Sequence, residues 1–580
     1  MNRNTEIHFS ELPTIDIGRS KFDRSHTKWS TIDAGRLYPM YVDTTIMPGD
    51  TVKMRTSELV RMMTPVAPVM DDCFMDVTAW FVPHRLVWPH FKRFMGENDT
   101  APWAQTGDYT VPMIYSNYSE GDKNGWLQHS LADYLGYPVF EDGATLEDGQ
   151  DETKSVEYEA SALPIRAYNL IWNEFWRDEN LQNPVNIDTG DAAKIAVSYD
   201  SNEDNDDYVT NSTFGGLKPL KVCKVPDYFT MCLPQAQKGP AVTLPMNGTA
   251  PIRTRTFEAD YEGTKYTYGQ NSGDLYMKKG SNASVNSSLI SDDIRTSSAE
   301  NFNINGFSKE GQLYADLTQA TGATISALRQ AFALQKFYER QARGGTRYIE
   351  MVKSHFGVTN PDFRLQRPEY LGGHRTLINM NQVVATTGAV NQPLGDTGAY
   401  SVTQNTDEDL FTHSFTEHGT LMILVCIRQR HSYTQGLNRQ FFMKNLTDFY
   451  FPEFANLSEQ PVYKKELWLE GGDLLENRKS TDNEAFGYQE AWAHYRYFPD
   501  EATGEMRATG QTGLGDVWTY QDHYTECPTL GDKWIEETKN NIQRTLAIQN
   551  HDQFLINMYF GAVYTRPMPL YSIPGLIDHH

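Results

Sequence analysis

One acidic stretch of the chain carries oxygen-bearing side chains at every second position: Asp200, Asn202, Asp204 and Asp206. Alternating carboxylate and amide oxygens are the ligands that calcium-binding loops supply to the ion. Such a loop needs a glycine at its sixth position and an acid at its twelfth, where this sequence has Asn205 and Asn211. The stretch is therefore better interpreted as a solvated acidic loop, with calcium binding as the alternative.

The sequence patterns that usually carry catalysis or metal binding are absent. The fifteen histidines are dispersed, without a His-Glu-x-x-His pair or a cysteine–histidine cluster at zinc spacing. No nucleophile elbow and no phosphate-binding loop occurs. The stretch 344–347 resembles a phosphate-binding turn, but it follows a predicted helix rather than opening one. These absences do not exclude an enzyme, because catalytic residues are often dispersed along a chain, but they leave no residue to which catalysis, a metal ion or a cofactor can be assigned. We expect a protein that is not an enzyme and that binds no metal ion and no cofactor.

Two basic stretches contain interleaved aromatic rings. Residues 329–375 carry nine lysines and arginines against four acids, and residues 428–444 carry four against none. Cations neutralise phosphates and aromatic rings stack on bases, so this combination predicts a surface for single-stranded nucleic acid. The alternative is that the cations pair with acids at subunit contacts. The residues that we expect to face DNA are Arg329, Lys336, Arg340, Arg343, Arg347, Arg428, Arg430, Arg439 and Lys444.

The cysteines and the apolar runs indicate a protein of the reducing cytosol. The five cysteines are widely spaced and odd in number, so we expect reduced thiols and no structural disulfide. Residues 1–17 are polar, unlike a secretion signal. The longest apolar run, residues 421–427, is too short to span a bilayer, so we expect no membrane insertion.

The hydrophobic pattern predicts strands that are far apart along the chain. Residues 75–81 alternate with period two, and residues 421–427 form a run typical of a strand buried on both faces. Residues 488–498 and 560–564 predict further strands. Because these strands must share one sheet system, we expect a mainly β protein, a sandwich with long excursions.

Three helices should position parts of this sheet system. The spacing of apolar residues predicts helices over 165–180 and 325–343, and a shorter one over 86–95. Their aromatic stripes include Tyr168, Trp172 and Phe332, which we expect to pack in the core.

Length and charge leave two organisations open. A compact core rarely exceeds about 300 residues, so 580 residues imply several domains or one core with long insertions. The net charge of −24 argues against a protein that coats itself in nucleic acid over its whole surface. Acidic and polar residues gather in three predicted surface excursions, 141–159, 188–216 and 247–306.

Several segments resemble a known family. They are residues 163–180, 341–350, 363–373, 435–439, 448–452 and 488–497. In this order they resemble the major capsid proteins of gokushoviruses, members of the Microviridae. The resemblance implies one domain over 1–580, a single eight-stranded antiparallel jelly roll of the viral coat type with large loop insertions that contain a few helices.

The resemblance also implies partners. About sixty copies would associate through pentamers into a T=1 icosahedral shell around a single-stranded DNA genome. Assembly would take place in the cytoplasm of the bacterial host. The implied partners are an internal scaffolding protein, a small DNA-binding protein, a DNA pilot protein and a receptor on the host cell surface.

Residues 247–306 lie where the family carries a surface protrusion at the three-fold axes. We expect this insertion to attach the particle to its host. The candidate anchors for it are Phe257, Tyr261, Tyr266, Tyr268 and Tyr276. Two rival interpretations remain: a carbohydrate-active β-sandwich enzyme, because the chain is rich in tryptophan, tyrosine and acids, and a non-viral shell or surface-layer protein.

Overall fold

The computed structural model describes residues 18–97, 109–118, 126–139, 156–192, 194–196, 213–240, 252–254, 257–261, 264–271, 274–279, 313–315, 325–343, 353–354, 367–386, 394–395, 397–469, 483–507 and 514–571. The chain divides into two compact units. The first consists of Met1–Ala236 with Gly344–His580, and the second of Gln237–Arg343.

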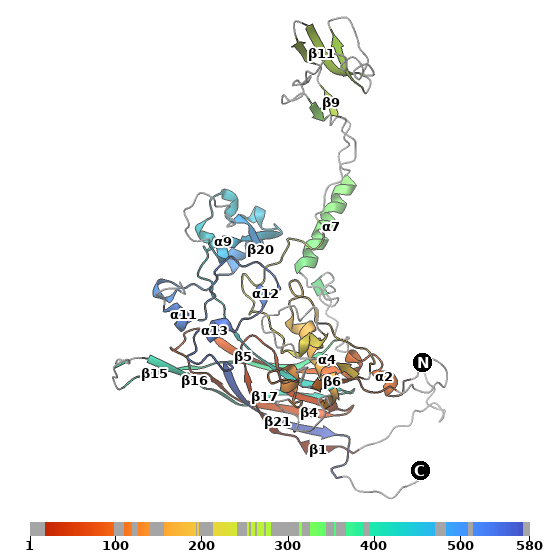
Figure 1. Ribbon diagram of the computed structural model, residues 1–580, viewed down its shortest axis with the longest axis vertical. Helices are drawn as coiled ribbons and strands as arrows, with labels where there is room; N and C mark the ends of the chain where they lie inside the picture. Colours follow the sequence, from red (N-terminus) through yellow and green to blue (C-terminus); the bar gives the residue numbers. More distant parts are fainter. Residues whose placement is uncertain are drawn as a thin grey trace, which may run out of the picture. The chain divides into compact units, whose positions relative to one another are not determined.

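Two antiparallel sheets form the centre of the first unit (Figure 1). The first sheet contains, in order, β14 (Glu369–Leu377), β5 (Cys73–Pro83), β18 (Gly419–Gln429) and β3 (Tyr38–Ile46). In the second sheet, β1 (Ser20–Asp23) and β2 (His26–Ile32) both pair with β21 (Phe554–Arg566), which is followed by β4 (Thr51–Met62) and β17 (Thr403–Ser414).

The strand pairs of the two sheets are nested along the chain. β2 pairs with β21, β3 with β18, β4 with β17 and β5 with β14, and all four pairs are antiparallel. Successive pairs alternate between the two sheets. The long connections leave from this nest: residues 84–368 join β5 to β14, and residues 430–553 join β18 to β21.

A shared core fills the space between the sheets. Met54 of β4, Val77 of β5, Ile423 of β18 and Phe560 of β21 all belong to one buried cluster. The intervening residues of β5 and β18 face the other way, into a second cluster that includes Met422. Residues 421–427 are therefore buried on both faces, as predicted, and the predicted strand over 560–564 is part of the longer β21.

Helix α4 (Leu163–Ile171) lies in the second cluster and continues as a π-helical turn, η2 (Trp172–Trp176). Tyr168 donates a hydrogen bond to the Leu37 carbonyl at 2.7 Å, which fixes the helix to the chain leading into β3. The predicted core stripe is confirmed for Tyr168 and Trp172. The prediction placed the end of this helix at Asn180, but the helical structure ends at Trp176. The Asp178 carboxylate accepts a hydrogen bond from the Asn180 backbone amide, which forms a turn there.

The other two helix predictions had different outcomes. Residues 84–94 form two short helices, α1 (His84–Val87) and α2 (Phe91–Phe94), because Pro89 forces Trp88 into an extended conformation. Helix α7 (Ile325–Arg343) has the predicted bounds. The prediction that its aromatic stripe is core was wrong for Phe332, which is 66% exposed.

A third cluster lies in the connection between β18 and β21. The hairpin of β19 (Glu459–Tyr463) and β20 (Ala485–Glu490) packs there against Trp534. The predicted strand over 488–498 is thus only partly correct. Trp492 adopts a positive φ of 67°, which turns the chain out of the sheet and into α10 (Ala493–Arg496).

The remaining elements are short. In the first unit they are β6 (Met113–Tyr118), α3 (Leu131–Leu135), β7 (Val156–Ser161), β8 (Lys194–Ala196), η3 (Thr213–Leu217), β15 (Met380–Val384), β16 (Thr397–Ser401), η7 (Arg439–Phe441), η8 (Leu446–Asp448), η9 (Pro452–Phe454), α9 (Lys464–Leu467), η11 (Gly504–Met506), α11 (Gly515–Trp518), α12 (Asp532–Ile535) and α13 (Asn540–Gln543). In the second unit they are β9 (Ile252–Thr254), β10 (Phe257–Tyr261), β11 (Thr264–Asn271), β12 (Asp274–Lys279) and β13 (Leu313–Ala315). The described residues thus form a mainly β protein with antiparallel sheets and few helices.

Candidate functional site

The predicted DNA-facing residues of the second unit lie along one side of α7. Arg329, Lys336, Arg340 and Arg343 are spaced at i, i+7, i+11 and i+14, which places them on one helical face. All four are exposed. Phe332, at the edge of this face, is also exposed. This face combines cations for phosphates with a ring for base stacking. Arg347 lies outside the described residues.

The predicted DNA-facing residues of the first unit divide into two kinds. Arg428 lies at the end of β18, and its guanidinium contacts the Asp76 carboxylate at 2.5 Å. Arg375 contacts the same carboxylate, also at 2.5 Å. Burial raises the pKa of Asp76, but the hydrogen bonds and charges of both arginines outweigh burial and leave it below its ordinary value. Arg428 is therefore held in an ion cluster within the fold, in which two arginines share one carboxylate.

Arg439 has a similar structural role. Its guanidinium donates to the Pro461 carbonyl at 2.8 Å and lies 3.4 Å from the largely buried Glu466 carboxylate. Burial keeps the pKa of Glu466 raised in spite of this cation. Arg430 and Lys444 differ because their side chains are exposed. In the first unit, these two residues are the better candidates for contact with a phosphate backbone.

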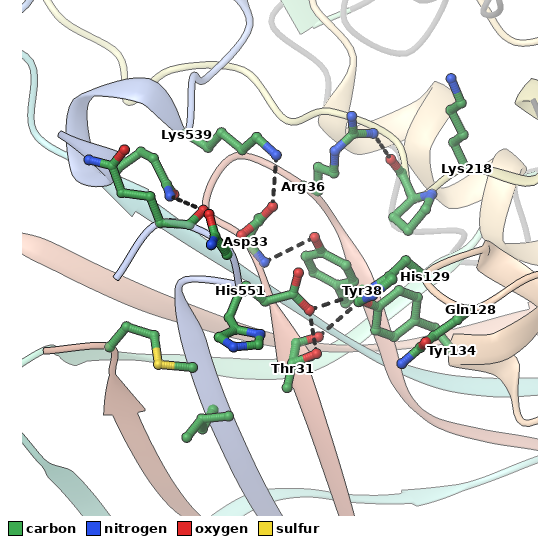
Figure 2. Close-up of a pocket in the computed structure, with 17 residues that line it drawn as sticks. Thr31, Asp33, Arg36, Tyr38, Gln128, His129, Tyr134, Lys218, Lys539 and His551 are labelled. Carbon is green, nitrogen blue, oxygen red and sulfur yellow. Dashed lines mark hydrogen bonds and ion pairs between the residues drawn. The ribbon is translucent and has the colours of Figure 1, made fainter. Parts of the chain in front are cut away.

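A polar cavity of about 800 Å³ lies in the first unit (Figure 2). No sequence pattern indicated it, because its lining comes from segments far apart in the chain. Lys539 contacts Asp33 at 3.1 Å, and His129 contacts Asp552 at 3.3 Å. The hydrogen bond that the His129 ring donates to Asp552 raises the pKa of His129 above its ordinary value. Arg36 donates to a backbone carbonyl at 2.8 Å.

The cavity does not provide the carboxylates that glycoside hydrolysis needs. Such an enzyme requires one carboxylic acid whose pKa is raised, so that it can protonate the leaving group. Burial raises the pKa of Asp552, but its hydrogen bonds and the charge of His129 outweigh burial and lower it. Asp33 is held by Lys539. Both carboxylates therefore act as counter-ions that tie separate segments together.

The described residues give no support to metal binding. No group of three or more histidine, cysteine, aspartate or glutamate side chains is placed to hold an ion within the described ranges. The stretch from Asp200 to Asp206 lies outside them. All five cysteines are described and are free thiols. Among the described helices, none is both long enough and apolar enough to cross a membrane.

The candidate anchors of the protrusion lie in one three-stranded antiparallel sheet of the second unit. Phe257 and Tyr261 belong to β10, Tyr266 and Tyr268 to β11, and Tyr276 to β12. In the strand register, Phe257 is opposite Tyr268 and Tyr276 is opposite Gly269. The side chains of these residues lie outside the described part of the structure.

Comparison with known proteins matches almost the entire chain. A family model described as "Capsid protein (F protein)" matches residues 10–576. Capsid protein VP1 of Chlamydia phage 1 is 35% identical over 98% of this chain and 97% of its own length. Capsid protein VP1 of Bdellovibrio phage phiMH2K is 34% identical, and that of Spiroplasma virus 4 is 35% identical, each over 99% of this chain and 98% of its own length.

These matches confirm the resemblance to gokushovirus capsid proteins. They exclude the enzyme interpretation. A structural protein also fits the ion pairs of the polar cavity, whose charged side chains tie separate segments of the chain together. The chain belongs to the phage capsid protein (F protein) family and is a structural component of a virion.

Proposed function

We propose that about sixty copies of this chain assemble, through pentamers, into a small T=1 icosahedral shell that encloses a single-stranded DNA phage genome. The observation that carries this proposal is the sandwich of four nested strand pairs, in a chain whose relatives are named capsid proteins over at least 98% of its length. Assembly in the cytoplasm of the bacterial host is part of the proposal.

The same nesting supports an eight-stranded jelly roll. A jelly roll arises when a long antiparallel hairpin wraps so that its successive strand pairs fall alternately in two sheets. The pairs β2–β21, β3–β18, β4–β17 and β5–β14 follow this rule, and β1 extends the edge. We propose that residues 1–580 are one capsid domain with long insertions, of which 247–306 is the protrusion.

Electron microscopy of the purified full-length protein tests the assembly. We expect closed particles of uniform small diameter, or pentamers that close into particles when the concentration is raised. Flat lattices would favour the surface-layer alternative. A protein that stays monomeric at all concentrations would contradict the proposal.

The exposed basic face of α7 supports its contact with the genome. Replacing Arg329, Lys336 and Arg340 with glutamine removes three cations from one helical face. Filled particles of this variant should release DNA at lower salt than the wild type, because fewer phosphates are neutralised.

The matched control for this variant replaces Arg19, Lys21 and Lys92, which are also exposed, with glutamine. It changes the net charge equally and should leave the salt dependence unchanged. An equal shift in both triple variants would mean that only net charge matters, which would contradict a specific role of α7. Crosslinking should place DNA adducts on α7, Arg430 and Lys444 rather than on 247–306.

Attachment to the host is the proposed role of residues 247–306. Replacing them with a short Gly/Ser linker removes β9–β12 and retains β13 and α7. The shortened protein should still form folded subunits, because the described residues that build the core between the two sheets all belong to the first unit. Particles built from it should no longer adsorb to host cells. Normal adsorption would disprove the attachment role, and a failure to fold would show that the segment belongs to the core.

We also propose the partners that the family resemblance implies. These are an internal scaffolding protein, a small DNA-binding protein, a DNA pilot protein and a host cell-surface receptor. Mass spectrometry of purified particles and of assembly intermediates should identify the first three. Their absence from both would contradict this part of the proposal.

A further inference from the structure

The connection between β18 and β21 exposes large apolar side chains to an unusual extent. They come from two segments, 441–457 and 495–498, which flank the β19–β20 hairpin in the sequence. We refer to them together as the aromatic surface: Phe441, Leu446, Phe449, Tyr450, Phe451, Leu457, Tyr495, Tyr497 and Phe498. Their exposed fractions range from 37% to 71%.

Contacts at Tyr450 and Tyr495 join the two segments. The rings of Tyr450 and Tyr495 lie 6.2 Å apart, and the backbone amide of Tyr450 donates to the Tyr495 hydroxyl at 3.3 Å. Trp492 lies beneath them, 5.6 Å from the Tyr450 ring, and its indole N–H donates to the Phe454 carbonyl at 2.9 Å. The exposed rings of Tyr450 and Tyr495 are thus held in place by packing against the buried Trp492.

The area of the aromatic surface is that of a protein interface. A fully uncovered side chain of this size presents roughly 150–250 Å², so nine side chains at these exposures leave about 1,000 Å² open. The largest apolar patch of a typical monomer is about 300–600 Å². A stable interface of standard size covers about 800 Å² on each partner.

A small cavity beside the aromatic surface contains polar atoms that lack partners. Its volume is about 270 Å³, and Phe441 and Tyr497 contribute to its lining together with Thr434 and His494. The Thr434 hydroxyl and the His494 Nε2 are buried and have no hydrogen-bond partner among the described residues. Burial and the neighbouring Arg439 lower the pKa of His494 to about 4. In the neutral ring, Nε2 can therefore donate or accept one hydrogen bond, depending on the tautomer.

The charges around the aromatic surface argue against nucleic acid as its partner. Arg496 is paired with Glu490 at 2.7 Å, and Arg439 lies against Glu466. The acids Asp500 and Glu501 line the cavity. Lys444, which lies between Phe441 and Leu446 in the sequence, is an exposed cation and remains a candidate for contact with DNA. Nine exposed apolar side chains with so few cations outside ion pairs are typical of the core of a protein interface, whereas a nucleic-acid site needs excess positive charge.

We propose that the aromatic surface is a contact between copies of this chain, and that a polar side chain of the neighbouring copy enters the cavity at Thr434 and His494. This inference rests on the proposed self-assembly. It deepens that proposal, because it assigns one of the contacts to a defined part of the connection between β18 and β21.

A matched pair of substitutions tests the contact. Leu446→Asp places a charge in the aromatic surface, and Leu394→Asp places the same charge in the turn between β15 and β16. The two leucines have similar exposed fractions, 71% and 73%. We expect Leu446→Asp to raise the protein concentration needed for assembly at least tenfold, and Leu394→Asp to leave it within twofold. Sedimentation velocity measures assembly, and circular dichroism checks that both variants fold.

A photo-crosslinking amino acid at Phe441 tests the same contact without disrupting it. Illumination of assembled particles should yield covalent dimers of the chain, and none from subunits kept below the assembly concentration. Adducts to DNA alone, or no dimers in intact particles, would overturn the inference. If the wild type forms no particles, the proposed function fails. If the wild type and Leu446→Asp assemble equally well, only the aromatic-surface contact fails.

Discussion

Replacement of His431 should show how strongly a buried ion network stabilises the connection between β18 and β21. His431 is fully buried directly after β18. Its Nδ1 lies 2.8 Å from Asp522, and its Nε2 lies 3.0 Å from Glu537. Lys224 contacts Asp522 at 3.2 Å, and Tyr524 donates to the same carboxylate at 2.6 Å. Burial lowers the pKa of His431, but the two carboxylates outweigh it and raise the pKa to about 10.

The substitution His431→Gln leaves two buried carboxylates without their shared cation. Breaking a buried pair by removing one partner costs about 3–5 kcal/mol, and we expect a loss of this size in the free energy of unfolding at pH 6. A group whose pKa is raised by folding stabilises fully below its unfolded pKa, about 6.5. This stabilisation is lost as the pH rises toward the folded value of about 10.

The difference in stability between the wild type and the variant should therefore shrink between pH 6.5 and pH 10, by at most about 1.4 kcal/mol per pH unit. Urea unfolding of the unassembled subunit, followed by tryptophan fluorescence, measures this difference. His551→Gln is the control, because His551 is exposed. A variant within 1 kcal/mol of the wild type at pH 6, or a difference that does not change with pH, would refute a charged His431.

Three further predictions concern the packing and the thiols. Gly436→Ala should cost at least about 2 kcal/mol, because its Cβ would lie 1.9 Å from the Glu466 carbonyl oxygen, whereas Gly398→Ala meets nothing within 4 Å and should be nearly neutral; urea midpoints test both. Tyr168→Phe should cost about 1–3 kcal/mol in the same assay, because its buried hydroxyl serves one backbone carbonyl and one backbone amide. Particles should melt at the same temperature with and without reductant, because all five cysteines are free thiols, and a lower midpoint under reductant would reveal a disulfide.

The sequence was sufficient to predict those features that depend on one continuous stretch of chain. Helix α7 begins and ends where its apolar spacing and the following Gly344–Gly345 pair predicted. Residues 421–427 were correctly predicted to be buried on both faces, because an uninterrupted apolar run has no polar side to turn toward water. The family resemblance was legible for the same reason: its segments are contiguous in sequence.

The sequence by itself determined the mainly β class, the bounds of α7, the dispersed cysteines and the relationship to phage capsid proteins. Only the tertiary structure decided which charges are free. Arg428 and Arg430 look alike in sequence, but Arg428 pairs with Asp76 on a strand far away in the chain, whereas Arg430 stays exposed. The nesting of the strand pairs and the aromatic surface also depend on segments that meet only in three dimensions. Local periodicity indicates which side of a strand or helix is buried, but long-range packing decides which residue or strand it contacts.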